Sequence, residues 1–233
     1  MKAPIFYSKP VPLAAEIHGT KRYRAVADFR FARAANAVPL GASEMGIAAR
    51  HYPLVFAAAE PGGIAAIMGV QTGENLFVDA EGKWAPDVYV PAFVRRYPFA
   101  FAEQDDKLVL CIDEAANALD DAEGPWLFNV DGTTTAFTDQ VVQFNREFQI
   151  QARAAAEFAT AAATAGLLAD NRAEIETRSG KKMTLGGFRV IDRAKFEALP
   201  DETFLEWRKR GWLDMAAAHF LSFHSWQNLI ARA

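Results

Sequence analysis

The sequence has very little cysteine and histidine. Its 233 residues contain one cysteine, Cys111, and four histidines. A single cysteine excludes a disulfide within the chain, and its setting in KLVLCID is typical of a small apolar residue in a buried strand. The sequence also lacks the Cys-x-x-Cys and His-Glu-x-x-His spacings of metal sites. We therefore expect neither a metal nor another cofactor.

A strong charge of either sign and long apolar runs are missing as well. Lys and Arg number 25 against 29 Asp and Glu, a net charge of -4, which argues against a nucleic-acid partner. The apolar runs are far shorter than the roughly 20 residues of a membrane-spanning helix, so no transmembrane segment is expected. The N-terminal segment is broken by Pro4, Pro10 and Pro12 and lacks the apolar stretch of a signal peptide. These absences predict a cytoplasmic protein.

The sequence also contains no familiar catalytic or nucleotide-binding motif. Gly-x-Gly-x-x-Gly, Walker-type and Gly-x-Ser-x-Gly patterns are all absent. The acid pairs Asp105–Asp106 and Asp120–Asp121 lie in polar turns, whereas paired acid–base catalysis needs carboxylates in contrasting surroundings. The motifs therefore leave the question of enzymatic activity open.

Apolar residues, in contrast, are abundant. They make up 51% of the chain, and 18 of them are Phe, which is enough for a sizeable core. In the first half, short apolar runs with Gly and Pro favour strands and turns. Residues 52–59 and 63–70 form a candidate hairpin, residues 75–84 a second one, and Leu108–Ile112 another strand. A short helix is predicted over Ser43–Arg50, with Ser43 as its N-cap.

One long helix is predicted from Thr138 to about Asp170. Apolar residues recur there at spacings of three and four, and the helix would be about 45 Å long. Gly166 marks a break or the approach to its end. The apolar face comprises Val141, Phe144, Phe148, Ala152, Ala155, Phe158 and Ala162. We expect this face to pack on the sheet of the N-terminal half.

Strand and helix signals alternate in the rest of the chain. Lys182–Ile191 is predicted to be a strand pair or one strand with a bulge at its paired glycines. Asp192 and Asp201 are each predicted to cap a helix, the second of which ends at Gly211. The whole chain, residues 1–233, is therefore expected to be a single α+β domain. In it, a mixed or antiparallel sheet in the N-terminal half packs against a long helix and smaller C-terminal helices.

The stretch Gly73–Phe101 has the composition of a binding site. Seven aromatic residues, three prolines and a pair of arginines lie within it, a pattern that no amphipathic helix requires. A guanidinium beside an aromatic ring can stack on the ring and bind a carboxylate or phosphate with two hydrogen bonds. The candidate ligand-binding residues in this stretch are Trp84, Tyr89, Arg95, Arg96 and Tyr97.

The two arginines also have a purely structural interpretation. A buried ion pair with Glu74 or Asp79 would hold the loop in place instead of binding a ligand. Neighbours in an extended chain point to opposite faces, so at most one of Arg95 and Arg96 is expected to face any one pocket.

His219 and His224 are the remaining candidates for ligand contact or catalysis. Their spacing of five residues places them on neither the same helical face nor the same strand face, although a turn between them would bring them together. The apolar neighbours of His219 in AHFLSFHSW are typical of a core histidine held by hydrogen bonds. A structural role and a place in a polar network or acid–base pair both stay open.

Several segments together resemble the SapC-like family of bacterial proteins. They are YPLVF, GENLFVDAEGKW, VYVPAFVRRYPFAF, LVLCID, PWLFN-x-DG and the tail GFRVIDRAKFEALPDETFLEWRKRGWLDMAAAHFLSFHSW. The resemblance covers roughly residues 5–230. It implies either a surface-layer role, from which the family takes its name, or an accessory role in a modification or uptake system, and it implies no catalytic residues.

Three functions remain open. The first is an accessory or binding protein that holds a peptide, a protein partner or a small acidic ligand on the surface lined by aromatic residues and arginines. The second is an enzyme acting on peptides or amino acids, with His219 and His224 as acid–base groups and Arg95 or Arg96 as an anion clamp. This enzyme would require these residues to meet in one concave pocket. The third is a structural protein of the surface layer.

Overall fold

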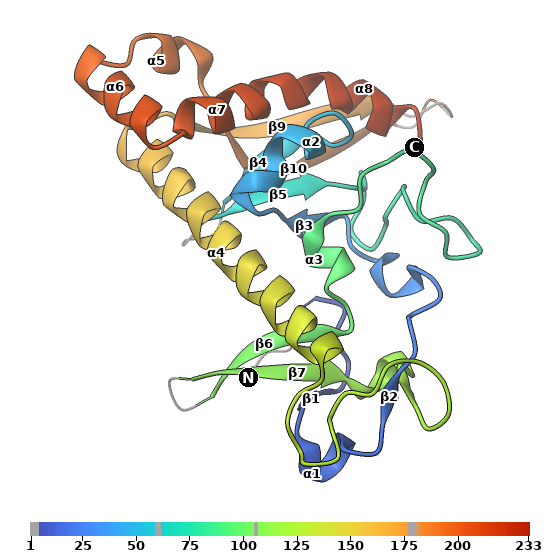
Figure 1. Ribbon diagram of the computed structural model, residues 1–233. Helices are drawn as coiled ribbons and strands as arrows, with labels where there is room; N and C mark the ends of the chain where they lie inside the picture. Colours follow the sequence, from blue (N-terminus) through green and yellow to red (C-terminus); the bar gives the residue numbers. More distant parts are fainter. Residues whose placement is uncertain (1–4, 59–61, 105–106, 177–179, 181) are drawn as a thin grey trace.

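The computed structural model describes residues 5–58, 62–104, 107–176, 180 and 182–233, and it has the expected α+β architecture. A long helix, α4 (Ala136–Thr164), crosses the molecule diagonally (Figure 1). A larger sheet and the C-terminal helices lie beside the C-terminal half of α4, and a smaller sheet lies beside its N-terminal half. The predicted combination of antiparallel sheets, one long helix and smaller C-terminal helices is confirmed.

The larger sheet has five antiparallel strands and joins both halves of the chain. In spatial order, its strands are β3 (Ala37–Pro39), β5 (Ile64–Ile67), β4 (Leu54–Ala57), β10 (Lys182–Ile191) and β9 (Leu168–Glu176). The predicted hairpin of β4 and β5 is confirmed by their antiparallel pairing, although residues 59–61 of its turn lie outside the described residues. Because β10 pairs with β4, the C-terminal strands extend the N-terminal sheet.

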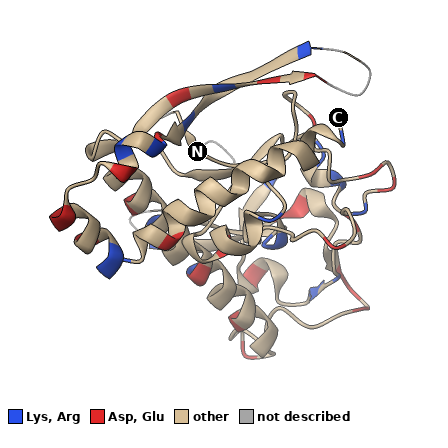
Figure 2. Ribbon diagram, turned by 90° about the horizontal axis from the view of Figure 1, so that it is seen from above, with Lys and Arg blue, Asp and Glu red and all other residues tan. Residues whose placement is uncertain are grey.

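Strand β10 has the bulge that its paired glycines predict. Its register with β9 shifts between Leu185 and Phe188. Gly187, at the shift, has a φ of 83°, in the left-handed region that glycine adopts without a Cβ clash. Figure 2 shows the β9–β10 ribbon extending along one side of the molecule, with basic and acidic residues interspersed along it.

The smaller sheet has three strands, in the order β1 (Pro10–Pro12), β7 (Lys107–Asp113) and β6 (Phe99–Gln104). Strands β2 (Arg22–Tyr23) and β8 (Leu119–Asp120) form a separate pair. Cys111 is buried in β7, as expected. The second predicted hairpin, over residues 75–84, is reduced to a single bridge between Val78 and Trp84. Its turn forms, but the pairing does not continue beyond that bridge.

The other helices are short. The α-helices are α1 (Ala15–His18), α2 (Met45–Ala48), α3 (Ala92–Arg95), α5 (Arg193–Glu197), α6 (Asp201–Lys209), α7 (Trp212–Leu221) and α8 (Ser225–Ile230). The 3-10 helices are η1 (Arg30–Ala32), η2 (Ala42–Glu44), η3 (Glu114–Ala116) and η4 (Ser222–His224). Across the described ranges, no helix is both long and apolar enough to cross a membrane.

The C-terminal helix boundaries are mostly those that the sequence predicts. Asp192 caps α5 by accepting a hydrogen bond from the Lys195 N–H at 3.2 Å, which confirms one predicted cap. Asp201 as a cap is wrong, because it is the first residue of α6 and the extended Pro200 is the N-cap. Gly211 follows the last residues of α6 with a φ of 72°, as a residue that ends a helix commonly does.

Helix α4 begins slightly earlier and ends earlier than predicted. The Thr135 hydroxyl oxygen accepts a hydrogen bond from the Thr138 N–H at 3.3 Å and caps the first turn. The helix ends at Thr164, and Gly166 adopts a φ of 68°. The prediction that helix continues to about Asp170 is wrong, because the residues from Leu168 onward pair with β10. Long-range pairing therefore overrides the local helical signal.

The apolar face of α4 serves two hydrophobic clusters. The upper cluster lies against the five-stranded sheet and the C-terminal helices and includes Phe148 and Phe158 of α4. The lower cluster lies on the smaller sheet, and Phe137 and Val141 of α4 pack against it. At about 1.5 Å per residue, the 29 residues of α4 span roughly 44 Å, which is enough to connect both clusters. One helix therefore contributes side chains to both clusters and helps to set how the two sheets lie relative to each other.

We expect Phe158→Ala to lower the free energy of unfolding by about 3–5 kcal/mol, because it leaves a cavity in the upper cluster. Phe158 is 0% exposed and lies between Phe56 and Trp207, with ring centroids 5.6 and 5.7 Å away. The matched control is Ile150→Ala on the same helix. Ile150 is 60% exposed, so its replacement should change stability by no more than about 0.5 kcal/mol. Urea unfolding at pH 7 measures both, and equal effects would contradict the assignment of the core.

Candidate functional site

Three of the predicted site residues line one pocket at the place where the two hydrophobic clusters meet. The pocket has a volume of about 340 Å³ and lies between the C-terminal end of α3 and the N-terminal half of α4; we call it the α3–α4 pocket. Its polar lining residues are Arg95, Arg96, Tyr97, Gln140 and Asn145, and its other lining residues are Tyr23, Phe99, Phe137, Val141 and Phe144. Its volume is at the lower end of the range of roughly 300–1,000 Å³ for small-molecule sites.

Both arginines line this pocket, so the prediction that at most one of them faces any one pocket is wrong. That prediction assumed an extended chain, whereas Arg95 is the last residue of α3 and Arg96 is its C-cap. A short helix forms because Pro91, at its N-cap, is followed by residues whose apolar side chains Phe93 and Val94 are buried in the upper cluster. Helical geometry then lets two successive side chains border the same cavity.

Arg96 is a buried cation without an acidic partner. Its side chain is only 9% exposed. The guanidinium carbon lies 4.3 and 4.5 Å from the ring centroids of Phe93 and Phe148. Within the described part of the chain, no carboxylate forms an ion pair with Arg96, and its Nε has no hydrogen-bond partner. The structural interpretation, a pair with Glu74 or Asp79, is therefore not what the described residues show.

Tyr7 lies beside the buried guanidinium and interacts with it, and the ring of Tyr97 packs edge-on against that of Tyr7, with centroids 5.3 Å apart. Tyr7 donates a hydrogen bond to the carbonyl of Phe99 at 2.7 Å, and Tyr97 donates one to Asp113 Oδ2 at 3.1 Å. Burial, and then the Asp113 charge, raise the pKa of Tyr97. Burial lowers the pKa of Arg96, and the neighbouring Tyr7 opposes that shift. Asp113 also accepts hydrogen bonds from three backbone N–H groups, so its carboxylate is satisfied without Arg96.

Arg95 is exposed and is held at the pocket by hydrogen bonds. Its Nε donates to the carbonyl of Val90 at 3.0 Å, and its Nη2 donates to the Tyr89 hydroxyl at 3.1 Å. Tyr89 in turn donates to Glu44 Oε1 at 2.8 Å, and burial followed by Glu44 raises the pKa of Tyr89. The guanidinium carbon of Arg95 also lies 5.3 Å from the ring centroid of Phe144. Tyr89 itself therefore positions Arg95 and does not line the pocket.

Glu44 explains why the predicted cap at Ser43 is wrong. Its carboxylate is buried and accepts the backbone N–H of Gly41 at 3.0 Å and that of Ala92 at 2.6 Å. The glutamate therefore caps the start of η2 from within the helix and ties it to α3. The Ser43 N–H instead donates to the side chain of Gln151 on α4 at 3.0 Å.

Asn145 on α4 is a site residue that the sequence did not reveal. It is 1% exposed and lines the α3–α4 pocket. Its Nδ2 donates to the Val141 carbonyl at 3.0 Å, while its Oδ1 has no hydrogen-bond partner among the described residues. The available signal was a buried amide on an otherwise apolar helical face, which a search for catalytic motifs does not detect.

Trp84, His219 and His224 lie away from this pocket. Trp84 is partly buried against the upper cluster, and its ring meets that of Phe29 edge-on at 5.3 Å. His224 is exposed on η4, whereas His219 is fully buried. The seven residues proposed from the sequence are therefore not brought together. The convergence that an enzyme with His219 and His224 as acid–base groups would require does not occur.

His219 connects α7 to two neighbouring strands. Its Nε2 accepts the backbone N–H of Ile191 at 3.1 Å, so Nδ1 carries the proton and donates to the carbonyl of Leu54 at 2.9 Å. Burial lowers the pKa of His219 to about 4. Both ring nitrogens are thus occupied, and the ring is neutral at pH 7.

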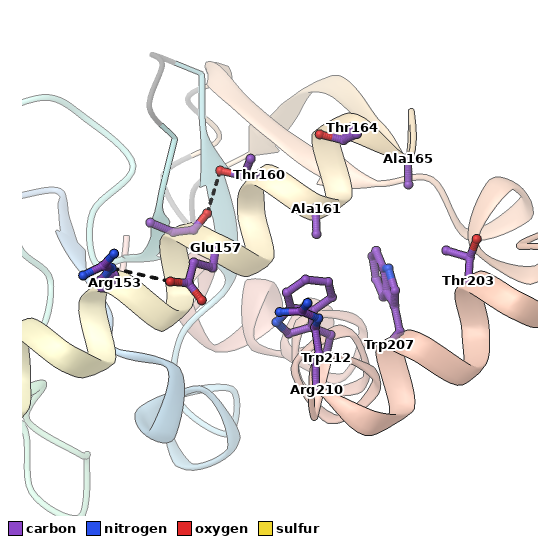
Figure 3. Close-up of a pocket in the computed structure, with 11 residues that line it drawn as sticks. Arg153, Glu157, Thr160, Ala161, Thr164, Ala165, Thr203, Trp207, Arg210 and Trp212 are labelled. Carbon is purple, nitrogen blue, oxygen red and sulfur yellow. Dashed lines mark hydrogen bonds and ion pairs between the residues drawn. The ribbon is translucent and has the colours of Figure 1, made fainter.

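A wider depression lies between the C-terminal half of α4, helix α6 and the first residue of α7 (Figure 3). It has a volume of about 790 Å³. Its arginines are already paired, Arg153 with Glu157 at 3.5 Å and Arg210 with Glu206 at 2.6 Å, and Figure 3 shows the first pair along α4. Because these charges are satisfied, the α3–α4 pocket is the stronger candidate for binding an anion.

The described residues offer no obvious metal centre. No three side chains of His, Cys, Asp or Glu gather among them as a metal site would require. The α3–α4 pocket is lined by guanidinium, amide, phenol and apolar groups, which are poor ligands for a cation. The two guanidinium groups in the lining make the pocket better suited to an anion than to a cation.

Comparison with known proteins supports the resemblance seen in the sequence. The model of the SapC family matches residues 13–229, nearly the whole chain. No curated protein and no solved structure matches the chain. The matched range contains α3, α4 and every residue that lines the α3–α4 pocket.

We expect His219 to make stability depend on pH. Because its pKa falls from 6.5 in the unfolded chain to about 4 in the folded protein, the unfolded chain binds more protons between these values. The stabilisation, about 3 kcal/mol, is fully present above pH 6.5 and is lost progressively as the pH falls from 6.5 to 4. Urea unfolding from pH 7 to pH 4 should show this loss in the wild type and not in His219→Gln. His224→Gln, the exposed control, should behave as the wild type; an unchanged slope in His219→Gln would contradict this account.

We expect Arg96→Met to leave the free energy of unfolding unchanged or to raise it by about 1–2 kcal/mol. Methionine fills the space between the two phenylalanine rings, and the cost of burying an unpaired charge disappears. Arg95→Met, at the exposed neighbour, should change stability by no more than about 0.5 kcal/mol. Thermal and urea unfolding measure both variants. A loss of more than about 2 kcal/mol in Arg96→Met would assign the guanidinium a structural role.

Proposed function

The chain belongs to the SapC family, and we propose that it is a binding protein that holds the carboxylate of a small acidic ligand in the α3–α4 pocket. The observation that carries this proposal is the buried guanidinium of Arg96, which has no carboxylate partner among the described residues. A ligand carboxylate would supply the negative charge that the described residues do not provide. Of the three partners that the sequence left open, a peptide, a protein and a small acidic ligand, we propose the small acidic ligand.

Electrostatics favour an anionic ligand at Arg96. An uncompensated charge inside a protein costs several kcal/mol, and stacking on the rings of Phe93 and Phe148 returns only about 1–4 kcal/mol in total. A planar guanidinium matches a carboxylate with two parallel hydrogen bonds, which are among the strongest that proteins make. Binding a carboxylate at Arg96 therefore gains more than the same contact would gain at an exposed arginine.

The shape of the pocket favours a ligand with an apolar part. Tyr23 stacks on Phe137 with ring centroids 5.0 Å apart, and Phe99 lies 5.3 Å from Tyr23. These rings belong to the lower cluster, whereas Arg96 lies against the upper one. The pocket thus has an aromatic end and a cationic end. A ligand that matches both ends carries its carboxylate on an aromatic or large apolar group.

Arg95 has a different part in this proposal. It is exposed at the pocket and is held in place by Val90 and Tyr89. In that position it attracts an approaching anion and adds a second, solvent-screened contact. Its contribution to affinity is therefore expected to be smaller than that of Arg96.

The lining of the pocket favours binding over catalysis. It includes no histidine and no carboxylate among the described residues, so the usual groups for general acid–base catalysis at neutral pH are missing. Burial raises the pKa of Tyr23 and of Tyr97, which makes both phenols weaker acids. An accessory role in a modification or uptake system fits a binding protein of this kind. The cytoplasmic location stays a prediction, and cell fractionation tests it.

Calorimetric titration with 3-phenylpropionate at pH 7 tests the proposal, with the neutral 3-phenylpropionamide as the matched control ligand. We expect the carboxylate to bind and the amide to bind at least tenfold more weakly. Arg96→Met should weaken carboxylate binding by about 30-fold or more, as the loss of a buried charged contact does. Arg95→Met should have a smaller effect, and Arg208→Met, on the distant α6, none. Equal binding of the two ligands, or unchanged binding by Arg96→Met, would contradict the proposal.

A further inference from the structure

We infer that the ligand of the α3–α4 pocket is an N-acylated α-amino acid with an aromatic or large apolar side chain, either free or as the last residue of a peptide. This inference rests on the proposed function and extends it. The additional observation is the side-chain oxygen of Asn145, which is unpaired among the described residues. A site that binds only a carboxylate at Arg96 would not need this oxygen, and no motif of the sequence accounts for it.

The amide of Asn145 offers an acceptor to the pocket. Its Nδ2 donates to the Val141 carbonyl at 3.0 Å. This contact fixes the orientation of the amide, because the flipped amide would place two oxygens against each other. The Oδ1 atom is consequently the free end; it is buried, and no described residue donates to it. A buried acceptor without a donor is costly, so an N–H or O–H group of a ligand would be favoured there.

This acceptor lies near the buried guanidinium. Asn145 precedes Phe148 by three residues on α4, so the two side chains share a face of the helix. The Arg96 guanidinium carbon lies 4.5 Å from the centroid of the Phe148 ring, and Arg96 and Asn145 both line the pocket. Two residues that line the same cavity therefore each carry a buried polar atom without a partner among the described residues, the donor Arg96 Nε and the acceptor Asn145 Oδ1.

The matching ligand has a carboxylate and an N–H group a short distance apart. An α-amino acid whose nitrogen is part of an amide has this arrangement, with its side chain on the carbon between the two groups. The carboxylate would pair with Arg96 and the amide N–H would donate to Asn145. The side chain would then reach the aromatic rings of Tyr23, Phe99 and Phe137.

A free amino acid is a poorer match. Its ammonium group would lie in a pocket that holds two guanidinium groups and, within the described residues, no carboxylate. Repulsion between like charges in a partly buried site would oppose binding. An acylated nitrogen keeps the N–H donor and removes this positive charge.

Four probes of one shape test the inference by calorimetric titration at pH 7. They are N-acetylphenylalanine, its N-methyl derivative, free phenylalanine and 3-phenylpropionate, which lacks the nitrogen. We expect N-acetylphenylalanine to bind about tenfold more tightly than each of the other three, the value of one buried hydrogen bond. The N-methyl derivative removes the donor from the ligand, so this comparison does not depend on the folding of any variant.

The variant Asn145→Leu tests the protein side of the same contact. It should lower the affinity for N-acetylphenylalanine by about tenfold and leave that for 3-phenylpropionate unchanged. Gln149→Leu, on α4 outside the pocket lining, is the control and should change neither. If Asn145→Leu does not fold, the comparison of the N-acetyl and N-methyl probes on the wild type shows whether a ligand N–H contributes to binding.

The outcomes separate this inference from the proposed function. If 3-phenylpropionate binds and the N-acetyl group adds nothing, the inference is wrong and the carboxylate site stands; an ordered water then satisfies Asn145. If free phenylalanine binds at least as tightly as its N-acetyl form, the inference is also wrong. If no carboxylate binds, both are wrong. Acetyl-Gly-Gly-Phe distinguishes the sources, because tighter binding than N-acetylphenylalanine indicates a peptide C-terminus and weaker binding a free acylated amino acid.

Discussion

The structure depends on one helix that is shared by two hydrophobic clusters. Helix α4 packs its C-terminal half against the five-stranded sheet and its N-terminal half against the smaller sheet (Figure 1). The two sheets belong to separate hydrophobic clusters, and α4 contributes side chains to both of them. Side chains from both clusters then meet at the junction, and the α3–α4 pocket lies there. Its location follows from the packing, as is common for ligand sites between separate hydrophobic units.

The junction of the two clusters also holds the buried charge of Arg96, which the packing around it does not explain. A leucine or methionine in place of Arg96 would pack against the two neighbouring aromatic rings without burying a charge. Proteins keep such costly groups mainly where they act on a ligand. The unpaired oxygen of Asn145, on the facing helix, is a second group of this kind in the same cavity. The burial of the Arg96 charge and the burial of the Asn145 oxygen each cost free energy for a separate reason. Their presence in one pocket supports ligand binding far more strongly than either group does alone.

Much of the fold and part of the site could be predicted from the sequence. The apolar periodicity of α4, the bulge of β10 and the aromatic stretch around Arg95 and Arg96 are local patterns, and each has a local cause. Strand β9 could not be predicted, because it depends on pairing with β10. Asn145 was hidden because its importance comes from the distant Arg96, which periodicity cannot reveal. His219 was correctly suspected of a core role, since its surroundings in the sequence are apolar.

The most direct test of the central claim is a crystal structure of the protein grown with N-acetylphenylalanine. The account predicts a carboxylate in contact with the guanidinium of Arg96, and the phenyl ring against Tyr23, Phe99 and Phe137. A pocket that contains only water, with Arg96 paired to a carboxylate of the protein itself, would contradict it. In that case the buried arginine would be part of the framework that joins the two clusters.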